Sequence, residues 1–401
     1  MQRAIVLPVP TDRELEAVVR RMMDDHWVPE GYAAPNSVVY PWQWLWDSCF
    51  HVLVWLTLGE DERACSELAV ALTAQTSSGF VPHMHYVRDP GFHQDLWGRR
   101  TGSSITQPPM YGHAVAELVR AGIPVDEVLV ERAVAGLWFL LNERRRDPSG
   151  LIRVCHPWET GADDSPRWDD CCTGGFDQQR WRTLKNRLVS TIETGPDGEA
   201  IANPAFEVAP ASFNALVAFN ARELVSVTGD AALAAASDEL VGGLAEQWDE
   251  QLGTWVDAGT MAEGSGRVRT LDSLLPLLVE GDASRADRVV AQLLDLTAHG
   301  GPAGPTGVHR AESSFDPETY WRGPVWPQLA HLVVRAVTPH SKVAADVLAM
   351  TTVAGAWASG LAEYWNPDTG VGLGAIPQSW TGLSLVLARW RMHCAEGGGS
   401  S

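Results

Sequence analysis

The stretch YPWQWLWDSCFHVLVWLTLGEDERACSELAVALTAQ, Tyr40 to Gln75, joins an aromatic loop to two amphipathic segments. Apolar residues recur at helical spacing from Leu45 to Leu58 and again from Glu62 to Gln75. We therefore expect one helix directly after the aromatic loop and a second helix after a short join. Alternating aromatic side chains in a loop that enters a helix can face one cavity, so the stretch also holds a candidate binding surface.

Helical periodicity continues along the rest of the chain. The joins between periodic segments carry Gly, Pro, Asp and Ser, as in HGGPAGPTG at His299–Gly307. Strand-like alternation is scarce, and Gly79–Tyr86 is the best candidate. The other segments with helical spacing are Asp12–Asp25, Tyr111–Ala121, Val125–Arg145, Phe213–Val227, Ala231–Glu250, Thr270–Leu278, Ala283–Ala298, Trp326–Val337, Lys342–Ser359 and Thr381–Met392.

About a dozen helices without parallel strands predict an all-α fold, and we expect an (α/α)6 barrel, a six-hairpin toroid. In that fold inner and outer helices alternate along the chain, and long loops at one end of the inner ring form a central active-site pit. Helical periodicity alone does not separate this barrel from an α-solenoid. Because the sequence has no strict repeat and no long linker, we expect one catalytic domain over residues 1–395. A disordered tail (EGGGSS) would then occupy residues 396–401.

The composition limits the classes of partner. A formal net charge of −20 argues against nucleic acid and anionic membrane surfaces, and no apolar run is long enough for a membrane span. The 18 tryptophans stand out, because an indole ring can stack on a sugar ring as well as pack in a core. We expect a small-molecule partner and leave a homo-oligomer open.

The six cysteines form no CxxC pair, and no histidine spacing completes a zinc pattern. The N-terminus has too short an apolar run for a signal peptide. We therefore expect reduced thiols, a cytoplasmic location, no cofactor and no metal. His83 and His85 have a spacing that metals can use, but no third ligand accompanies them.

Five segments combine aromatic, polar and turn residues in a way that ordinary loops do not. They are YPWQWLWD (Tyr40–Asp47), SSITQPP (Ser103–Pro109), HPWETGADDSPRWDD (His156–Asp170), YWRGPVWPQ (Tyr320–Gln328) and EYWNPDTGVGLGAIPQSWTG (Glu363–Gly382). The third and fifth place carboxylates among tryptophans. Hydrolysis of a glycosidic bond needs two such groups, since one protonates the leaving oxygen while the other activates water or attacks carbon. A lone acid in a polar loop is usually only solvated, so the hypothesis depends on the aromatic context and on the second segment.

In the same order, these five segments resemble those of glycoside hydrolase family 63 and its small bacterial members, the glucosylglycerate and mannosylglycerate hydrolases. The family's patterns read approximately YPxxWxWD, SGITQPP, WESGxDNSPRWD, YWRGPxWP and AEYYxPxTGxxxGxxxQSWT. The match spans Tyr40 to Thr381, and its order is far more specific than any single motif. The resemblance implies an (α/α)6 barrel and an inverting mechanism, with the general acid at Asp163 and the general base at Glu363.

The resemblance also implies a set of sugar-binding positions. Tryptophan faces can stack on a pyranose, and Asp47 and Gln107 can form hydrogen bonds with ring hydroxyls. We expect His156 to orient the loop that carries Asp163 (His156–Asp170, called the acid loop below) rather than to react. The family's positions fall on Tyr40, Trp44, Trp46, Asp47, Gln107, Trp321, Gly323, Trp326, Gln378 and Trp380, and we add Trp158 and Tyr320 from the same segments.

A general acid must keep its proton near neutral pH, so the pKa of Asp163 must be raised. Trp158 and Trp168 can desolvate its carboxyl, and the neighbouring Glu159 and Asp164 add like-charge repulsion. The Glu363 carboxyl must instead stay ionised, because it accepts a proton from water.

The sequence departs from the family where the leaving group would bind. Asp164 stands in place of the family's Asn, and Thr160 in place of its Ser. The segments Tyr86–Gly102 and Phe176–Arg187 do not reproduce the parts that contact glycerate in those hydrolases. The neutral Gln178 and Gln179 favour an uncharged polyol or aminocyclitol-like aglycone. An inward-facing Arg180 or Arg182 would favour a carboxylate such as glycerate, so the aglycone stays open.

We predict an inverting α-glycosidase that acts on a small α-glucoside or α-mannoside similar to glucosylglycerate or mannosylglycerate. One alternative is a sugar epimerase or isomerase on the same fold, which would need histidine acid/base pairs lining the pit. The other is a non-catalytic carbohydrate-binding protein, which would not need both carboxylates.

Overall fold

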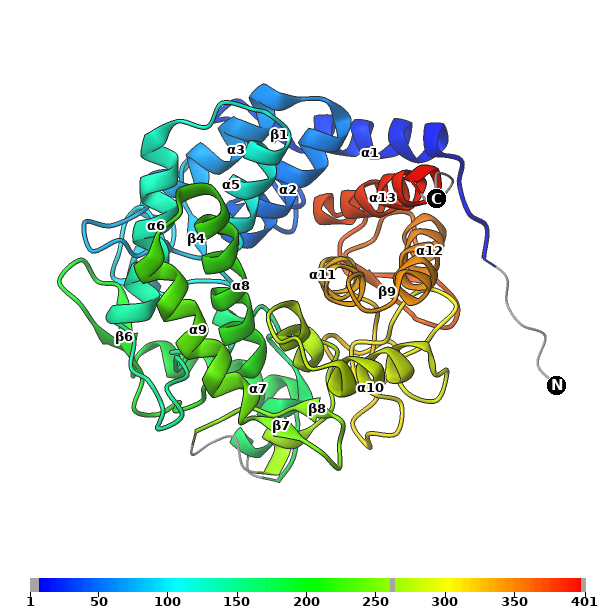
Figure 1. Ribbon diagram of the computed structural model, residues 1–401. Helices are drawn as coiled ribbons and strands as arrows, with labels where there is room; N and C mark the ends of the chain where they lie inside the picture. Colours follow the sequence, from blue (N-terminus) through cyan, green and yellow to red (C-terminus); the bar gives the residue numbers. More distant parts are fainter. Residues whose placement is uncertain (1–6, 173, 260–263, 398–401) are drawn as a thin grey trace.

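The helices form two concentric rings in the computed structural model, which describes residues 7–172, 174–259 and 264–397 (Figure 1). Each member of the inner ring contacts the next, and the last contacts the first, so the ring is closed. Closure excludes an open α-solenoid. In order, the inner members are α2 (Leu45–Leu58), α5 (Tyr111–Arg120), α8 (Ala211–Thr228), the 3-10 helix η4 (Asp272–Leu278), α11 (Pro327–Val337) and α13 (Leu383–Gly397).

The outer helices alternate with the inner ones along the sequence, which confirms the predicted (α/α)6 barrel. Within the described residues, no helix has the length and apolarity that crossing a membrane requires. The outer members are α1 (Asp12–His26), α3 (Asp61–Thr73), α6 (Glu127–Asn142), α9 (Ala231–Ala245), α10 (Ala283–Leu294) and α12 (Lys342–Ala358).

Side-chain chemistry explains which helices are inside. Helix α2 is apolar on almost every face, and only Leu56 and Thr57 of its residues lie outside the core. Helix α10 instead buries one narrow stripe, formed by Ala286, Val289 and Leu293, and exposes the remaining faces. A helix that is apolar all round is stable only when it is surrounded by other elements, whereas a striped helix covers a surface.

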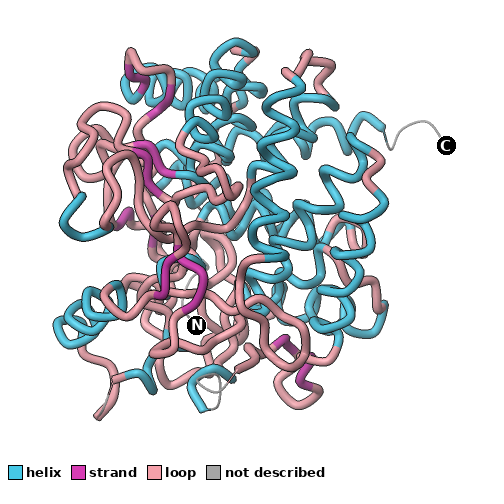
Figure 2. The backbone as a smooth tube through the Cα atoms, turned by 90° about the vertical axis from the view of Figure 1, so that its left-hand side faces the viewer, coloured by secondary structure: helices cyan, strands magenta, loops and turns pink. Residues whose placement is uncertain are grey.

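The predicted aromatic segments lie at the N-terminal ends of inner helices. Tyr40–Asp47 runs into α2, Ser103–Pro109 precedes α5, Tyr320–Gln328 runs into α11, and Glu363–Gly382 leads to α13. Pro327 at the first turn of α11 is favourable because its missing N–H has no helical partner there. Figure 2 shows that loops and strands gather on one side of the helical body.

The strands are short and pair as antiparallel two-stranded ladders. Within the predicted Gly79–Tyr86 strand, only β4 (Met84–His85) is extended, and it pairs with β3 (Gln43–Trp44). This ladder attaches the first aromatic segment to the loop before α5. The other strands are β1 (Trp27–Val28), β2 (Tyr32–Ala33), β5 (Glu193–Thr194), β6 (Ala200–Ala202), β7 (Trp248–Asp249), β8 (Thr254–Trp255), β9 (Tyr364–Trp365) and β10 (Gly372–Leu373).

Short helices occur within the long loops. Most of the segment Phe176–Arg187 is helical, because it overlaps helix α7 (Gln178–Val189), whose N-cap is Asp177. Helix α13 includes Glu396 and Gly397, the first two residues of the predicted tail, and residues 398–401 lie outside the described residues. The remaining short helices are α4 (Gln94–Trp97), η1 (Pro157–Thr160), η2 (Pro166–Cys171), η3 (Gly264–Arg267) and η5 (Ser379–Gly382).

Candidate active site

A cavity of about 930 Å³ opens at the N-terminal ends of the inner helices. All five predicted segments contribute to its wall, although they are far apart in the sequence. The predicted residues that line it are Tyr40, Trp44, Trp46, Asp47, Gln107, Trp158, Asp163, Tyr320, Trp321, Glu363, Gln378 and Trp380.

Two predicted sugar-binding residues, Gly323 and Trp326, do not line the cavity. Trp326 is fully buried and stacks behind Trp321, with ring centroids 3.7 Å apart and an interplanar angle of 6°. At Gly323, a Cβ atom would lie 2.3 Å from the Asp316 carbonyl oxygen, so the position accepts only glycine. Both residues support the cavity wall from behind.

Trp321 carries backbone strain as well as a cavity-facing ring. Its φ is 60°, in the left-handed region that bulky side chains rarely adopt. Such strain costs on the order of 1–3 kcal/mol and persists only where surrounding contacts enforce it. Here the contacts are the stacked Trp326 and the edge of Tyr320, whose ring centroid lies 6.0 Å away.

Asp163 lies in the loop between η1 and η2 and is partly exposed toward the cavity. The pKa of its carboxyl is raised to about 7, chiefly by burial against protein and in addition by the charges of Asp164 and Glu363. The Lys185 ammonium and a hydrogen bond from Tyr320 act in the opposite direction. The net result is a carboxyl that holds its proton close to neutral pH.

One part of the predicted environment of Asp163 is wrong. Glu159 does not face the acid, because its carboxylate forms a two-pronged ion pair with the buried Arg144, at 2.6 and 2.8 Å. It also accepts hydrogen bonds from the backbone N–H groups of Thr106 and Cys155. Glu159 therefore fastens the acid loop to the loop before α5, and the like charges near Asp163 are Asp164 and Glu363.

His156 has the orienting position that the sequence analysis expects. It is fully buried; its Nδ1 accepts a hydrogen bond from the Trp158 backbone N–H, and its Nε2 lies 2.9 Å from the Lys185 carbonyl oxygen. Burial lowers the pKa of this imidazole to about 4, so it is neutral at pH 7. The ring links the acid loop to α7 and is enclosed by protein.

Glu363 precedes strand β9 and is almost completely buried. The Tyr40 hydroxyl donates a hydrogen bond of 3.0 Å to Oε1, and the Ala375 backbone N–H donates one of 2.9 Å to Oε2. Burial raises the pKa of the Glu363 carboxyl, whereas these two donors lower it. Both carboxyl oxygens are therefore fixed in place while the group faces the same cavity as Asp163.

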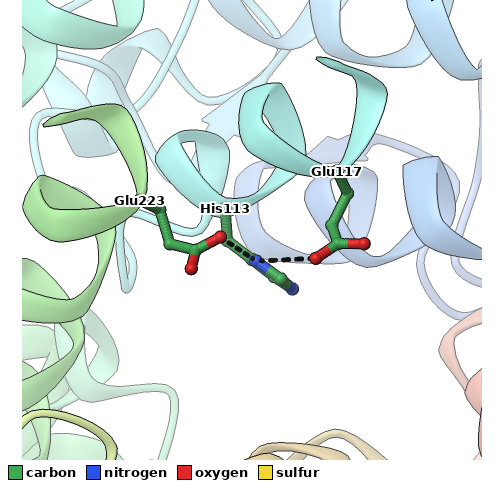
Figure 3. A group of neighbouring side chains, drawn as sticks. All are labelled: His113, Glu117 and Glu223. Atoms are coloured by element: carbon green, nitrogen blue, oxygen red, sulfur yellow. Dashed lines mark hydrogen bonds and ion pairs between the residues drawn. The ribbon is translucent and has the colours of Figure 1, made fainter. Parts of the chain in front are cut away.

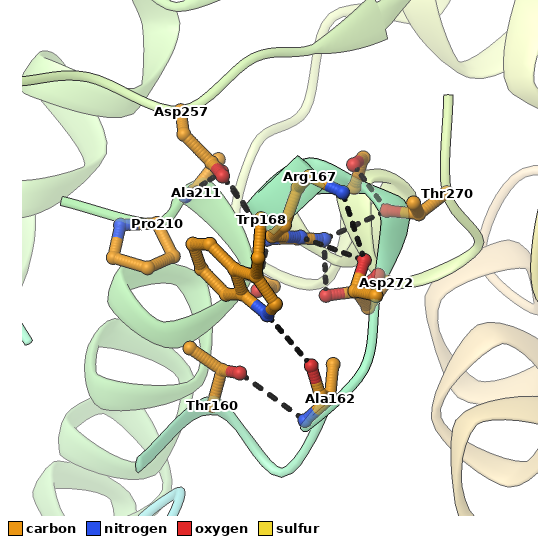
Figure 4. A network of polar contacts seen from close by, with 12 residues as sticks. Thr160, Ala162, Arg167, Trp168, Pro210, Ala211, Asp257, Thr270 and Asp272 are labelled. Carbon is orange, nitrogen blue, oxygen red and sulfur yellow. Dashed lines mark hydrogen bonds and ion pairs between the residues drawn. The ribbon is translucent and has the colours of Figure 1, made fainter. Parts of the chain in front are cut away.

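A buried arginine anchors the acid loop to the barrel (Figure 4). Arg167, in η2, donates to both Asp257 oxygens at 3.3 Å, to Thr270 at 2.7 Å and to Asp272 at 2.5 Å. Asp272 belongs to the inner 3-10 helix η4, so the loop is bonded directly to the inner ring. Trp168 adds a hydrogen bond from its indole N–H to the Ala162 carbonyl oxygen.

Helix α7 contributes four polar residues to the cavity wall, and their spacing of i, i+4, i+7 and i+8 places them on one face of the helix: Gln178, Arg182, Lys185 and Asn186. Gln179 and Arg180 do not reach the cavity; they line a shallow depression on another face of the helix. Lys185 also lines the cavity, although the sequence motifs did not predict it. The rarity of lysine in this chain was the available signal, because only Lys185 and Lys342 are present.

The histidines considered as metal ligands have other partners. His83 bonds to the Ser103 hydroxyl and His85 to the Val70 carbonyl oxygen. Among the described residues, His113, Glu117 and Glu223 have the spacing of a metal site (Figure 3). Both carboxylates are ion-paired with Arg120 and Arg335, so cationic charge already occupies this cluster. We interpret it as a salt-bridge network between α5, α8 and α11.

Comparison with known proteins identifies the family and confirms the fold. Residues 40–381 match the family described as the mannosylglycerate hydrolase MGH1-like glycoside hydrolase domain. The chain belongs to this family. It is therefore a glycoside hydrolase, and the matched range begins and ends in the first and last predicted segments.

The relatives agree with this assignment. A mannosylglycerate hydrolase from Rubrobacter radiotolerans is 28% identical over 94% of this chain and 97% of its own length. A glucosylglycerate hydrolase from Mycolicibacterium hassiacum is 27% identical over 88% of this chain and 92% of its own length. The crystal structure of a mannosylglycerate hydrolase from Thermus thermophilus, in complex with Tris and D-glycerate, superposes with a TM-score of 0.77. That comparison covers 94% of this chain and all of the other, at 24% identity, and confirms the fold.

Proposed function

We propose that this protein is an inverting α-glycosidase in which Asp163 is the general acid and Glu363 the general base. The observation that carries the proposal is that these two carboxyls, from distant parts of the chain, share one tryptophan-lined cavity and have different environments. Asp163 has a pKa of about 7 and is partly exposed to the cavity. Both oxygens of Glu363 accept hydrogen bonds, which favours its ionised form.

The proposed reaction needs no group beyond these two and a water molecule. Asp163 donates its proton to the glycosidic oxygen as the bond from that oxygen to the anomeric carbon breaks. Glu363 takes a proton from a water that attacks the same carbon from the opposite face. The products are the free aglycone alcohol and a sugar of inverted configuration, with the proton now on Glu363 rather than on Asp163. Exchange with solvent resets both groups.

The substrate we propose is an α-glucoside or α-mannoside of a small hydroxy acid such as glycerate. The general acid protonates the leaving oxygen, so the aglycone must lie beside Asp163. Helix α7 packs at this place, because the Trp181 indole N–H donates a hydrogen bond to the Asp163 carbonyl oxygen. Arg182 lines the cavity there, and no described residue forms a hydrogen bond or ion pair with it. Arg182 is exposed to solvent at the cavity, and a substrate carboxylate there could form a charge-assisted hydrogen bond with it. Of the two glutamines that favoured a neutral aglycone, only Gln178 lines the cavity.

The epimerase alternative has less support. Of the histidines, His83 and His93 line the cavity, and burial lowers the pKa of both imidazoles. His83 bonds to Ser103 and His93 to the Tyr86 hydroxyl, so each already has a structural partner. A cytoplasmic location remains part of the proposal, and the free thiols of Cys49, Cys65, Cys155, Cys171 and Cys172 are compatible with it. Self-association is left open.

The test is hydrolysis of α-glucosylglycerate, α-mannosylglycerate and the matching glycerol glycosides, followed by NMR from the first turnover. We expect the β-anomer of the sugar to appear first, and then to equilibrate. Asp163→Asn is nearly isosteric and should lower turnover of these unactivated substrates by about 10²–10⁴-fold. Early formation of the α-anomer, or near wild-type turnover by the variant, would contradict the assignment.

A further inference from the structure

Lys185 joins α7 to the acid loop through two groups, its side-chain ammonium and its backbone carbonyl oxygen. Its ammonium forms an ion pair with Asp164, the residue directly after the acid, and its backbone carbonyl oxygen meets His156 Nε2 at 2.9 Å. The ammonium also lies 5.8 Å from the Trp158 ring centroid and 5.7 Å from that of Trp181. Lys185 is 8% exposed and Asp164 6%, so water screens this pair only weakly.

The pair adjoins the Asp163 carboxyl. Trp181, one turn before Lys185 on α7, donates its indole N–H to the Asp163 carbonyl oxygen at 2.9 Å. The titratable and charged groups that act on Asp163 come from four elements. They are Asp164 of its own loop, Lys185 of α7, Tyr320 of the loop before α11 and Glu363 before β9. Tyr40 is the further tyrosine in this group, because its hydroxyl binds Glu363 and it interacts with Asp163.

The two members of the pair act on Asp163 in opposite directions. A neighbouring anion makes ionisation of the acid less favourable, whereas a neighbouring cation makes it more favourable. With both present the two effects oppose each other, and that of Lys185 is the larger.

Building on the proposed acid role of Asp163, we infer that Asp164 and Lys185 are positioning residues that act as one charge-balanced unit. The unit holds α7 against the acid loop and adds no net charge beside the Asp163 carboxyl. Lys185 belongs to the catalytic apparatus through Asp164 and Asp163 rather than through the sugar.

The test is the pH profile of kcat/KM between pH 5 and 9 for wild type, Asp164→Asn, Lys185→Met and the double variant. The substrate is whichever glycerate α-glycoside the wild type hydrolyses faster. The basic limb reports loss of the Asp163 proton from the free enzyme. Asp164→Asn leaves the cation alone and should move this limb to lower pH. Lys185→Met leaves the anion alone and should move it to higher pH, each by about 1 unit.

The double variant Asp164→Asn/Lys185→Met removes both charges and should return the limb close to its wild-type position. A purely structural role would lower kcat/KM across the whole pH range without moving the limb in opposite directions. Lys185→Arg retains the cation and should keep a near wild-type profile. Arg187→Met removes one charge from an exposed position on the same helix, outside the cavity wall, and should leave the limb unmoved.

Lys185→Met leaves Asp164 buried and unpaired, which typically destabilises a fold by about 3–5 kcal/mol. If that variant does not fold, comparison of Asp164→Asn with the double variant still tests the inference. Removal of Lys185 from Asp164→Asn should then return the basic limb to higher pH. Identical limbs in these two variants would overturn the inference. Asp163→Asn separates the two levels of the argument: if it abolishes turnover while the limbs coincide, the acid assignment stands and the charge-balanced unit does not.

Discussion

At the scale of single residues, two adjacent aspartates have different electrostatic settings. Both line the cavity, but Asp164 is buried and ion-paired with Lys185, whereas Asp163 is more exposed and lies near Glu363 and Tyr320. The neighbouring carboxyl of Glu363 accepts two hydrogen bonds. In the proposed mechanism, environment rather than residue type therefore separates a structural acid, a proton donor and a proton acceptor.

The raised pKa of Asp163 leads to a pH prediction. An acid catalyst works only while protonated, so kcat/KM should be high below the pKa of about 7 and fall as pH rises through it. Glu363 must be ionised, so the rate should also fall at acidic pH, as the pH drops through the raised pKa of that carboxyl. Initial rates in buffers of constant ionic strength from pH 4 to 9 check this. A rate that stays flat above pH 8 would contradict Asp163 as the acid.

The stacked pair Trp321 and Trp326 separates binding from packing. Trp321 lines the cavity, so Trp321→Ala should raise KM and leave the protein folded. Trp326 is fully buried, so Trp326→Ala should reduce the free energy of unfolding by about 3–5 kcal/mol. Urea unfolding monitored by circular dichroism, with kinetics on the folded fraction, distinguishes the two effects. If both variants lost only stability, Trp321 would be a packing residue.

At the scale of elements, α7 lines the side of the cavity where we propose that the leaving group binds. Arg182→Ala should raise KM for the glycerate glycosides by roughly tenfold or more, because a charge-assisted hydrogen bond contributes about 1.5–3 kcal/mol. The same change should have little effect on a glycerol glycoside, which has no carboxylate. Arg187→Ala on the exposed face of α7 is the control. Equal losses on charged and neutral substrates would indicate that Arg182 does not bind the aglycone.

At the scale of the whole molecule, the acid loop belongs to the barrel through Arg167. Arg167→Met leaves Asp257 and Asp272 buried without this cation, which should reduce the free energy of unfolding by about 3–5 kcal/mol at pH 7. Burial already raises the pKa of Asp257, and loss of the cation raises it further. A folded-state pKa above the unfolded value means that stability is recovered as the pH falls below it.

The loss of unfolding free energy caused by Arg167→Met should therefore become smaller as the pH falls from 8 to 5, as measured by urea unfolding. Arg153→Met, which breaks a half-buried pair with Glu207, should cost only about 1 kcal/mol and serves as the control. Turnover by Arg167→Met should fall as well, since the loop that carries Asp163 loses its bond to η4. A deficit that does not change with pH would mean that the two carboxylates find other partners.

The sequence by itself determined the series of amphipathic helices and the order of the five segments, and its resemblance to a known family predicted the (α/α)6 barrel. Closure of the helical ring, which separates the barrel from an α-solenoid, was decided only by the tertiary structure. Helical periodicity is a local property of the sequence. A motif directly before an inner helix such as α2 lies at the same end of the ring as the motifs that precede other inner helices. Only the tertiary structure decided which side of each loop faces inward. Trp321 and Trp326 look equivalent in YWRGPVWPQ, yet one faces the cavity and the other is buried behind it. Glu159 pairs with Arg144 instead of facing Asp163, and Lys185 adjoins the acid through its ion pair with Asp164. The sequence did not predict these pairs, because ion pairs form between residues that only folding brings together.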